Sequence, residues 1–491
     1  MNQLFKLAAL AAPALAAVVL QENAAFRVIE KDVAIIGGGA SGAYAAIRLK
    51  EDYGKSIVLV EKEAALGGHV DTMTDPDTGL PVDFGVAVFS DYGPARSFFE
   101  RMNVTVGPQI RVTLANKYID FTTGQTVNYT PASFPTGTLP AFQRFYNAIK
   151  PFESYLLPGY WNFPSAAKDI PADLLLPFGE FIKKYNLEEG IYMTFSTTGL
   201  GVGDMVNEMT LWVLAAFGQP MLEAMLGISP AFQPVSGRNI EIYEAMAARL
   251  TPNKDVLYSS TVIQSVRSSA LGITLWVKNS VTGQITLIRA KKLLMSIEPT
   301  VDGNLVPFSL DATEYGLLSK FEYTTVQAGV VSHPSLPAQT SLINIPASAI
   351  SAANGTDYTV LPGLGGAAFN ARFDHIGGDS KLWRVLLVGP QRGFTNAVGQ
   401  KLVKENLEKM IASGALPAGT TSEFEIKGWE NHGVMHAKVS AKELKNGFFK
   451  KLYALQGRRS TFWTGGAFAM NFQAVLWAFD DVLLPTLVAS L

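Results

Sequence analysis

The stretch from Asp32 to Glu61 carries the pattern that most constrains the fold of this chain. It reads as a short apolar strand, a glycine turn, an Ala-rich segment and a second apolar strand. Two short apolar runs separated by one longer Ala-rich run predict a β-α-β unit whose helix begins around Ala40. We expect the rest of the chain to be organised around this unit.

The glycine turn has the spacing G-x-G-x-x-G, supplied by Gly37, Gly39 and Gly42. The first glycine permits the tight turn, the second lets the backbone approach a pyrophosphate, and the third allows helix and strand to pack closely. The N–H groups around Ala40 and Ser41 are expected to face the phosphates. A lone match to this spacing also occurs in flexible loops, so the flanking strand and helix are what favour a dinucleotide site.

Glu61 ends the second apolar strand, about 20 residues after the last glycine. A carboxylate at this place can accept hydrogen bonds from both hydroxyls of an adenosine ribose, and it disfavours a 2′-phosphate. The acid therefore strengthens the prediction of a dinucleotide.

A second glycine turn follows the β-α-β unit. The run E-K-x-x-x-L-G-G-H-x-x-T over residues 61–72, with V-D-F-G at 82–85, resembles the flavin amine oxidase and phytoene desaturase superfamily. The second turn, which NAD-only domains do not need, lies in that superfamily against the pyrophosphate and ribityl chain of FAD, so the resemblance implies FAD. The cofactor-binding residues that it adds here are Lys62, Gly67, Gly68, His69, Val70, Phe84 and Gly85. It also implies a backbone hydrogen bond from Val262 to adenine.

Residues 457–485 combine a strand, a double glycine and a helix, and they resemble the closing FAD motif of the superfamily. The resemblance implies that Gly465 and Gly466 contact the pyrophosphate. The helix should start near Asn471, and its first N–H groups, around Phe472, should face the flavin pyrimidine ring. Many amine oxidases carry Gly-Glu where this chain has Gly-Gly. The run is more similar to the branch that contains β-cyclopiazonate dehydrogenase and polyenoic fatty acid isomerase.

The resemblance implies an α/β fold in which a Rossmann-type FAD-binding domain of the GR2 type is interleaved with an α+β substrate domain, as in amine oxidases. The predicted FAD-binding domain takes residues 30–90, 235–298 and 420–491, and the substrate-binding domain takes 91–234 and 299–419. Helices are expected at 178–185 and 204–217. Strands are expected at 256–266, 271–277, 284–288, 291–297, 324–332 and 383–388.

The chain contains no cysteine. This excludes disulfides, thiolate nucleophiles, Cys-ligated metals and a cysteinyl flavin linkage, so we expect FAD to be held non-covalently. His432 and His436 are four residues apart and would share one face of a helix. A metal site needs a third ligand, however, so structural or channel-lining histidines are favoured and no metal site is predicted.

Residues 1–16 have the layout of a signal peptide, with one Lys, an apolar Leu/Ala/Val run and a small-residue cleavage pattern. Secretion is therefore expected, and a retained membrane anchor is the alternative. Asn103, Asn128 and Asn354 begin N-glycosylation sequons. The apolar C-terminal segment contains Asp480 and Asp481, which favours a packed helix over a membrane span.

The formal net charge of −2 gives no basic surface for nucleic acid. The sequence predicts a secreted FAD-dependent oxidoreductase that removes a hydride from a C–H bond of a hydrophobic small molecule, amine-like or secondary-metabolite-like, with dioxygen as the acceptor. The alternatives are a redox-neutral isomerase of polyunsaturated fatty acids and a flavin-binding protein without turnover. No catalytic residue is assigned; Lys320 lies only roughly where amine oxidases place a lysine near the flavin.

Overall fold

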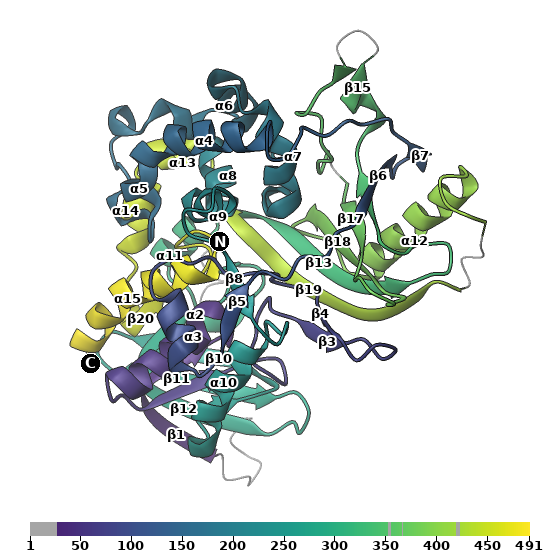
Figure 1. Ribbon diagram of the computed structural model, residues 1–491. Helices are drawn as coiled ribbons and strands as arrows, with labels where there is room; N and C mark the ends of the chain where they lie inside the picture. Colours follow the sequence, from purple (N-terminus) through teal and green to yellow (C-terminus); the bar gives the residue numbers. More distant parts are fainter. Residues whose placement is uncertain (1–26, 352–354, 366, 419–422) are drawn as a thin grey trace, which may run out of the picture.

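The computed structural model describes residues 27–351, 355–365, 367–418 and 423–491. The predicted signal peptide and the sequon at Asn354 lie outside these residues. Two seven-stranded sheets organise the described chain, and helices pack around them (Figure 1).

The first sheet contains the predicted β-α-β unit. Its strands run in the order β10-β11-β12-β1-β2-β9, with β20 paired to β12. Strands β12, β1, β2 and β9 are parallel, as are β12 and β20, whereas β10, β11 and β12 form an antiparallel meander. The bounds are β1 Arg27–Ile36, β2 Ile57–Val60, β9 Val256–Leu257, β10 Ser260–Ser268, β11 Gly272–Asn279, β12 Ile285–Met295 and β20 Thr461–Trp463.

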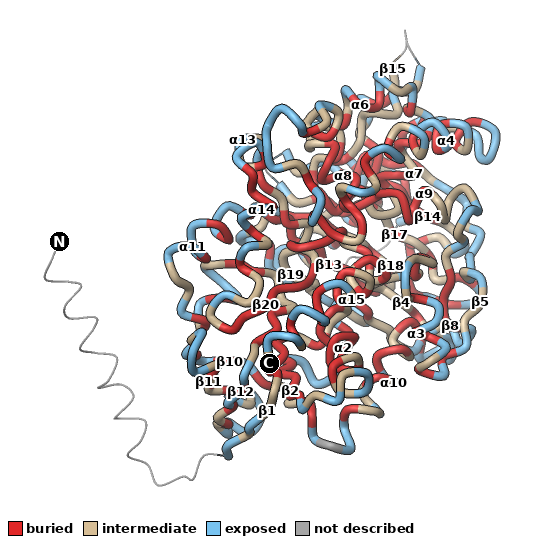
Figure 2. Tube along the Cα trace, turned by 90° about the vertical axis from the view of Figure 1, so that its left-hand side faces the viewer, coloured by how far each residue is buried: buried red, intermediate tan, exposed pale blue. Residues whose placement is uncertain are grey.

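Helices α2 (Ala40–Ile47) and α15 (Gln473–Ala489) pack against each other beside this sheet. The indole of Trp477 stacks on the Tyr44 ring at 5.1 Å and donates a hydrogen bond to the Ala40 carbonyl at 3.0 Å. The chain around both helices is largely buried (Figure 2). The other elements here are the π-helical turn η1 Arg48–Asp52, α3 Ala95–Arg101, α10 Glu241–Leu250 and α11 Ala312–Leu318.

The second sheet has the order β19-β13-β18-β17-β14-β6-β7. Its bounds are β6 Ala115–Asp120, β7 Gln125–Thr126, β13 Glu322–Ser332, β14 Thr340–Asn344, β17 Phe369–His375, β18 Trp383–Pro390 and β19 Glu425–Lys438. Helix α12 (Asn396–Ala412) lies against it. Three two-stranded pairs accompany the sheets: β3 Thr72–Thr74 with β4 Pro81–Asp83, β5 Val106–Pro108 with β8 Phe232–Pro234, and β15 Ile350–Ser351 with β16 Gly355–Thr356.

A group of helices adjoins the second sheet at the upper left of Figure 1. Aromatic side chains form much of its core. Its members are α4 Thr138–Ile149, α5 Glu153–Leu156, α6 Phe178–Tyr185, α7 Glu188–Thr197, α8 Thr210–Ala216, α9 Gln219–Met225, α13 Ala441–Lys445 and α14 Phe448–Tyr453.

The structure confirms the α/β class, the β-α-β unit and the helix at 178–185. The C-terminal segment is a packed helix: buried Asp480 accepts a hydrogen bond from Thr464, and Asp481 pairs with Arg48. Within the described part of the chain, no helix combines the length and the apolar character that crossing a membrane requires. Asn103 and Asn128 are exposed, and glycosylation there stays a prediction.

Several predicted boundaries are wrong. Of the helix expected at 204–217 only α8 is present, because residues 204–208 form bends and turns and Met209 forms a β-bridge with Pro177. The strand expected at 256–266 is divided at Ser259, whose φ is +48°, into β9 and β10. The two strands expected at 284–288 and 291–297 are one continuous strand, β12.

The predicted domain boundary at residue 420 also conflicts with the strand pairing. It places β19 with the FAD-binding segments, whereas β19 pairs with β13 in the second sheet. A sequence boundary drawn by composition could not anticipate this, because the partner strand lies about a hundred residues earlier. The division into domains otherwise stays a prediction.

Candidate dinucleotide site

The carboxyl ends of four parallel strands form one edge of the first sheet. Strands β20, β12, β1 and β2 are neighbours in that order, so the loops that follow them lie side by side. Ser296, just after β12, donates a hydrogen bond to the Gly37 carbonyl at 3.0 Å, and its own carbonyl lies near Gly465 after β20. In open α/β sheets, ligands bind at this edge.

The first glycine turn has the geometry expected for an anion site. Gly37 has φ +99°, and a Cβ on Gly42 would collide with the Gly37 carbonyl oxygen, so both positions require glycine. Helix α2 has Gly39 as N-cap and no side-chain cap, and the buried Ser41 Oγ has no hydrogen-bond partner. The first backbone N–H groups of α2 are therefore available to a phosphate.

The second glycine turn packs directly on the first. The Gly67 N–H donates to the Gly38 carbonyl at 3.1 Å, and a Cβ on Gly68 would lie 2.7 Å from the Gly39 Cα. Gly85 packs against this turn so closely that a Cβ there would collide with the His69 carbonyl oxygen. The sequence predicted both turns separately, and the structure brings them into contact.

Glu61 points its carboxylate into the first turn. It accepts hydrogen bonds from the Gly38 N–H at 2.5 Å and the Glu63 N–H at 2.8 Å. Each oxygen keeps a lone pair that could accept from a ribose hydroxyl. The neighbouring Ser260 N–H donates to the Glu61 carbonyl at 2.8 Å, which brings Val262 of β10 to the same end of the sheet.

The remaining predicted residues differ in their placement. Val70 is buried, and Phe84 is half-buried beside Gly428 of β19. Lys62 does not join the site through its side chain, which is 70 % exposed and pairs with Glu63. Lys320 pairs with Glu443 instead of contributing a free amine.

The closing segment brings a second helix N-terminus to the edge. Strand β20 leads into Gly465 at φ +101°, and α15 begins at Gln473 with Phe472 as N-cap and no side-chain cap. The predicted start near Asn471 is thus accurate to two residues. The uncapped N–H groups can stabilise negative charge on a ligand that lies close to the helix N-terminus.

Two histidine rings meet beside the second glycine turn, and a third, His436, packs against Gly201. The His69 and His432 rings are 5.0 Å apart, and His432 Nε2 lies 2.9 Å from Asp71 Oδ2. Burial lowers the pKa of His69 to about 3 and that of His436 to about 4, so both rings are neutral near pH 7. His432 and His436 lie on strand β19 rather than on a helix. Among the described residues, no group of three His, Cys, Asp or Glu side chains could hold a metal ion.

Sequence reasoning missed Glu298, which follows β12 at the same edge. Its Oε1 lies 2.8 Å from the place that a Cβ on Gly466 would occupy, and its Oε2 is buried without a hydrogen-bond partner. An acid three residues beyond a buried strand was the available signal, but the contact with Gly466 depends on tertiary structure.

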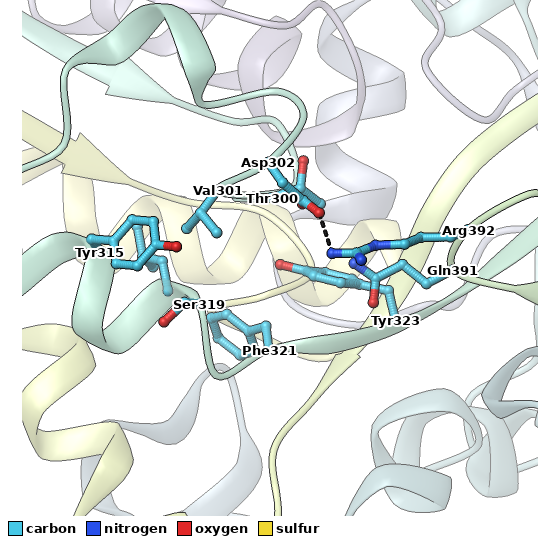
Figure 3. Close-up of a pocket in the computed structure, with 10 residues that line it drawn as sticks. Thr300, Val301, Asp302, Tyr315, Ser319, Phe321, Tyr323, Gln391 and Arg392 are labelled. Atoms are coloured by element: carbon cyan, nitrogen blue, oxygen red, sulfur yellow. Dashed lines mark hydrogen bonds and ion pairs between the residues drawn. The ribbon is translucent and has the colours of Figure 1, made fainter.

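A small cavity of about 230 Å³ lies next to this region, between α11 and β13. Its lining includes Tyr323, Thr300 and Gln391, and an ion pair between Asp302 and Arg392 spans it (Figure 3). Ligand pockets usually measure about 300–1,000 Å³ and are mostly apolar. The cavity is therefore too small and too polar to be taken as the substrate site.

The site geometry agrees with what comparisons with known proteins show. Residues 35–102 match the NAD(P)-binding Rossmann-like domain family. The chain is 32 % identical to the beta-cyclopiazonate dehydrogenase of Aspergillus oryzae over 94 % of both chains. It is 30 % identical to an FAD-dependent oxidoreductase of Monascus ruber, over 94 % of this chain and 93 % of the relative.

Among solved structures, a CLA-producing fatty acid isomerase from P. acnes shares the fold with a TM-score of 0.66 at 16 % identity, over 93 % of this chain and 98 % of that one. The cyclohexylamine oxidase of Brevibacterium oxydans IH-35A gives 0.59 at 15 % identity, over 94 % and 99 %. At these identities the likeness concerns the fold alone. It confirms the predicted amine-oxidase-like architecture.

Proposed function

Because this chain belongs to the family of FAD-dependent oxidoreductases that includes beta-cyclopiazonate dehydrogenase, we propose that it removes a hydride from a C–H bond of a hydrophobic small molecule. The family membership confirms the predicted cofactor, FAD, and the predicted enzyme class. The substrate, the hydride step and dioxygen as acceptor belong to the proposal.

One observation carries the proposal: two glycine turns in contact, with two uncapped helix N-termini, at the carboxyl edge of the first sheet. Glycines at Gly39 and Gly68 let backbone N–H groups approach a pyrophosphate, while Glu61 can hold the ribose. The start of α15 can stabilise charge on a flavin ring. FAD, when bound, supplies the hydride acceptor.

The neutral histidines support a role for the protein in positioning rather than in proton transfer. His69 and His436 are unprotonated near pH 7, and burial rather than a charged partner is the main cause. Neither ring is therefore poised to exchange a proton near neutral pH. We assign His69 to the packing of the second glycine turn against His432 of β19, and His436 to the packing of β19 against Gly201.

The test is the visible spectrum of the purified protein, followed by oxygen consumption with amines, indoles and polyunsaturated fatty acids. We expect a flavin spectrum and oxygen uptake with peroxide release on one substrate class. Conversion of substrate without oxygen uptake would favour the redox-neutral isomerase over an oxidase. Purified protein that neither contains nor takes up flavin would refute the proposal.

Glu61→Ala is expected to weaken FAD binding. The change removes the acceptor for the Gly38 and Glu63 N–H groups as well as for the ribose. Losing hydrogen bonds to a charged acceptor costs about 2–3 kcal/mol, which raises the Kd roughly 30- to 150-fold. Titration of apoprotein with FAD, followed by flavin fluorescence, measures the change. Glu63→Ala is the control, because that side chain is 68 % exposed; equal effects of the two variants would contradict the assignment.

We also propose secretion, on the layout of residues 1–16. Mass spectrometry of protein collected from the culture medium should show a mature N-terminus after the small-residue cleavage pattern. Protein retained in cells with Met1 intact would contradict it.

A further inference from the structure

Glu298 is an acid at the cofactor edge to which nothing so far gives a role. It lies three residues beyond the end of β12, and the Ser296 between them contacts the first glycine turn. The residue is half-buried, but its Oε2 is inaccessible and has no hydrogen-bond partner among the described residues. A buried carboxyl oxygen without a partner costs about 1–3 kcal/mol or more, and the cost is larger for a carboxylate than for a neutral carboxyl group. The other oxygen, Oε1, lies on the side of Gly466, and this half-buried side of the residue is the part that can meet a ligand at the binding edge.

Glu298 occupies space that a side chain at position 466 would need. A Cβ at position 466 would lie 2.5 Å from Asn471 Oδ1 and 2.8 Å from Glu298 Oε1. Position 466 therefore cannot carry a side chain while Glu298 keeps its place. Where many amine oxidases have an acid at this position of the closing motif, this chain has a glycine and brings a carboxyl group from the loop after β12.

We propose that Glu298 is a further cofactor-binding residue, whose carboxyl group fills the space beside Gly466 and donates a hydrogen bond to an oxygen of bound FAD. The proposal rests on the FAD site described above. It assigns Glu298 a role in binding and positioning, not in the chemical step.

The surroundings of Glu298 hold it neutral. Burial raises the pKa of Glu298 to about 8, and no charged group contributes to that rise. From β13, Tyr323 faces it, and burial raises the pKa of the Tyr323 phenol well above its ordinary value, with the charges of Glu298 and Asp302 adding to the rise. Arg392 lines the same cavity as Tyr323 and pairs with Asp302 (Figure 3), and its side chain is 80 % exposed. Before α15, the neighbour is the uncharged Asn471.

The protonation state decides what such a group can do for an anionic cofactor. A protonated carboxyl has one O–H donor, whereas a carboxylate only accepts and repels the phosphate charge. FAD affinity should therefore fall as Glu298 ionises. This gives the role a signature that a purely structural residue lacks.

The experiment is a titration of apoprotein with FAD between about pH 6 and pH 9.5, followed by flavin fluorescence. Wild-type Kd should be constant up to about pH 7.5 and then rise, by at most about tenfold per pH unit, above the pKa of about 8. Glu298→Gln, which is neutral at every pH, should show a flat profile and near-wild-type affinity at pH 7. Glu298→Ala should bind FAD more weakly at all pH values.

Parallel wild-type and Glu298→Gln profiles, or full affinity in Glu298→Ala at pH 7, would overturn the proposal. If wild-type protein binds no FAD at any pH, the cofactor site itself fails, which is a different result.

Thermal melting of the apoproteins gives an independent check. The folded pKa lies above the unfolded value of 4.5, so ionisation in the unfolded state penalises wild type progressively between pH 4.5 and about 8. Glu298→Gln should gain melting temperature over wild type across that window, and a constant difference would show that Glu298 is already ionised.

Discussion

Gly39→Val is expected to give a folded protein that has lost its flavin. Gly39 has φ −79° and ψ −160°, an extended conformation that any residue adopts, so valine introduces no backbone strain. A Cβ there would lie 3.4 Å from the Gly68 Cα, which leaves no room between the two glycine turns for a branched side chain and a pyrophosphate together. The expected result is loss of the flavin absorbance with an unchanged circular dichroism spectrum, and a Kd for FAD raised by more than about a thousandfold, or about 4 kcal/mol.

Substitutions at two other glycines allow the effect on flavin binding to be told apart from an effect on the fold. Gly42→Ala should disrupt the fold itself, because its Cβ would collide with the Gly37 carbonyl oxygen. Gly316→Ala is the matched control: Gly316 is an exposed residue inside α11, and a Cβ there meets nothing within 4 Å. Alanine should stabilise that helix by about 0.5–1 kcal/mol. Retention of flavin in folded Gly39→Val would contradict the placement of the pyrophosphate.

The parts of the fold that the sequence predicts are those in which all the determinants are close together in the chain. The β-α-β unit places strand, turn, helix and acid within residues 32–61, and the structure has each of them. Helix α6 matches its prediction at both ends, since apolar spacing is a local signal. The helix expected at 204–217 begins only at Thr210, because residues 204–208 form bends and turns and Met209 forms a β-bridge with Pro177, a contact that composition does not reveal.

Non-local pairing accounts for the other errors. Strand β19 belongs to the second sheet because it pairs with β13, and nothing in its own sequence reveals the partner. The predicted strand is interrupted at Ser259 because β9 pairs with β2, whereas β10 turns away to pair with β11. An alternating pattern alone cannot show that one apolar run forms two strands, each with a different partner strand.

The candidate site likewise combines segments that local sequence predicts with contacts that it does not predict. Each glycine segment was predicted from its own motif, and the structure brings all of them to one edge. Contact between His69 and His432, and between Glu298 and Gly466, joins residues far apart in sequence. The first contact follows from the packing of β19, a strand of the second sheet, beside the second glycine turn, and the second contact follows from the parallel pairing of β12 with β20.

Arg267→Met is expected to cost about 3–5 kcal/mol of stability. Arg267 and Glu314 are fully buried and form a two-point ion pair, with N–O distances of 2.8 and 2.7 Å. Arg267 also donates to the Phe308 carbonyl at 2.8 Å and to Thr461 Oγ1 at 3.1 Å. Its removal leaves Glu314 buried with only the partly exposed Arg459 and the Asp311 N–H as partners. The urea midpoint of the apoprotein measures the loss.

The controls separate burial from charge pairing. Arg238→Met breaks an exposed pair with Glu244, with side chains 44 % and 49 % exposed, and should cost less than about 1 kcal/mol. The double variant Arg267→Met with Glu314→Leu should recover much of the loss, because it removes the uncompensated charge. A loss in Arg267→Met no larger than that of the exposed pair would contradict the buried network.

This network is also connected to the cofactor edge. Thr461, whose hydroxyl accepts a hydrogen bond from Arg267, begins β20, and β20 leads directly into Gly465 and Gly466. If β20 is held in register by Arg267, the variant should bind FAD more weakly as well as unfold earlier. Since a ligand that binds only the folded state stabilises it by mass action, saturating FAD should then raise the urea midpoint of Arg267→Met less than that of wild type at the same free FAD concentration. Equal increments in the two proteins would show that the ion pair stabilises the fold without shaping the site.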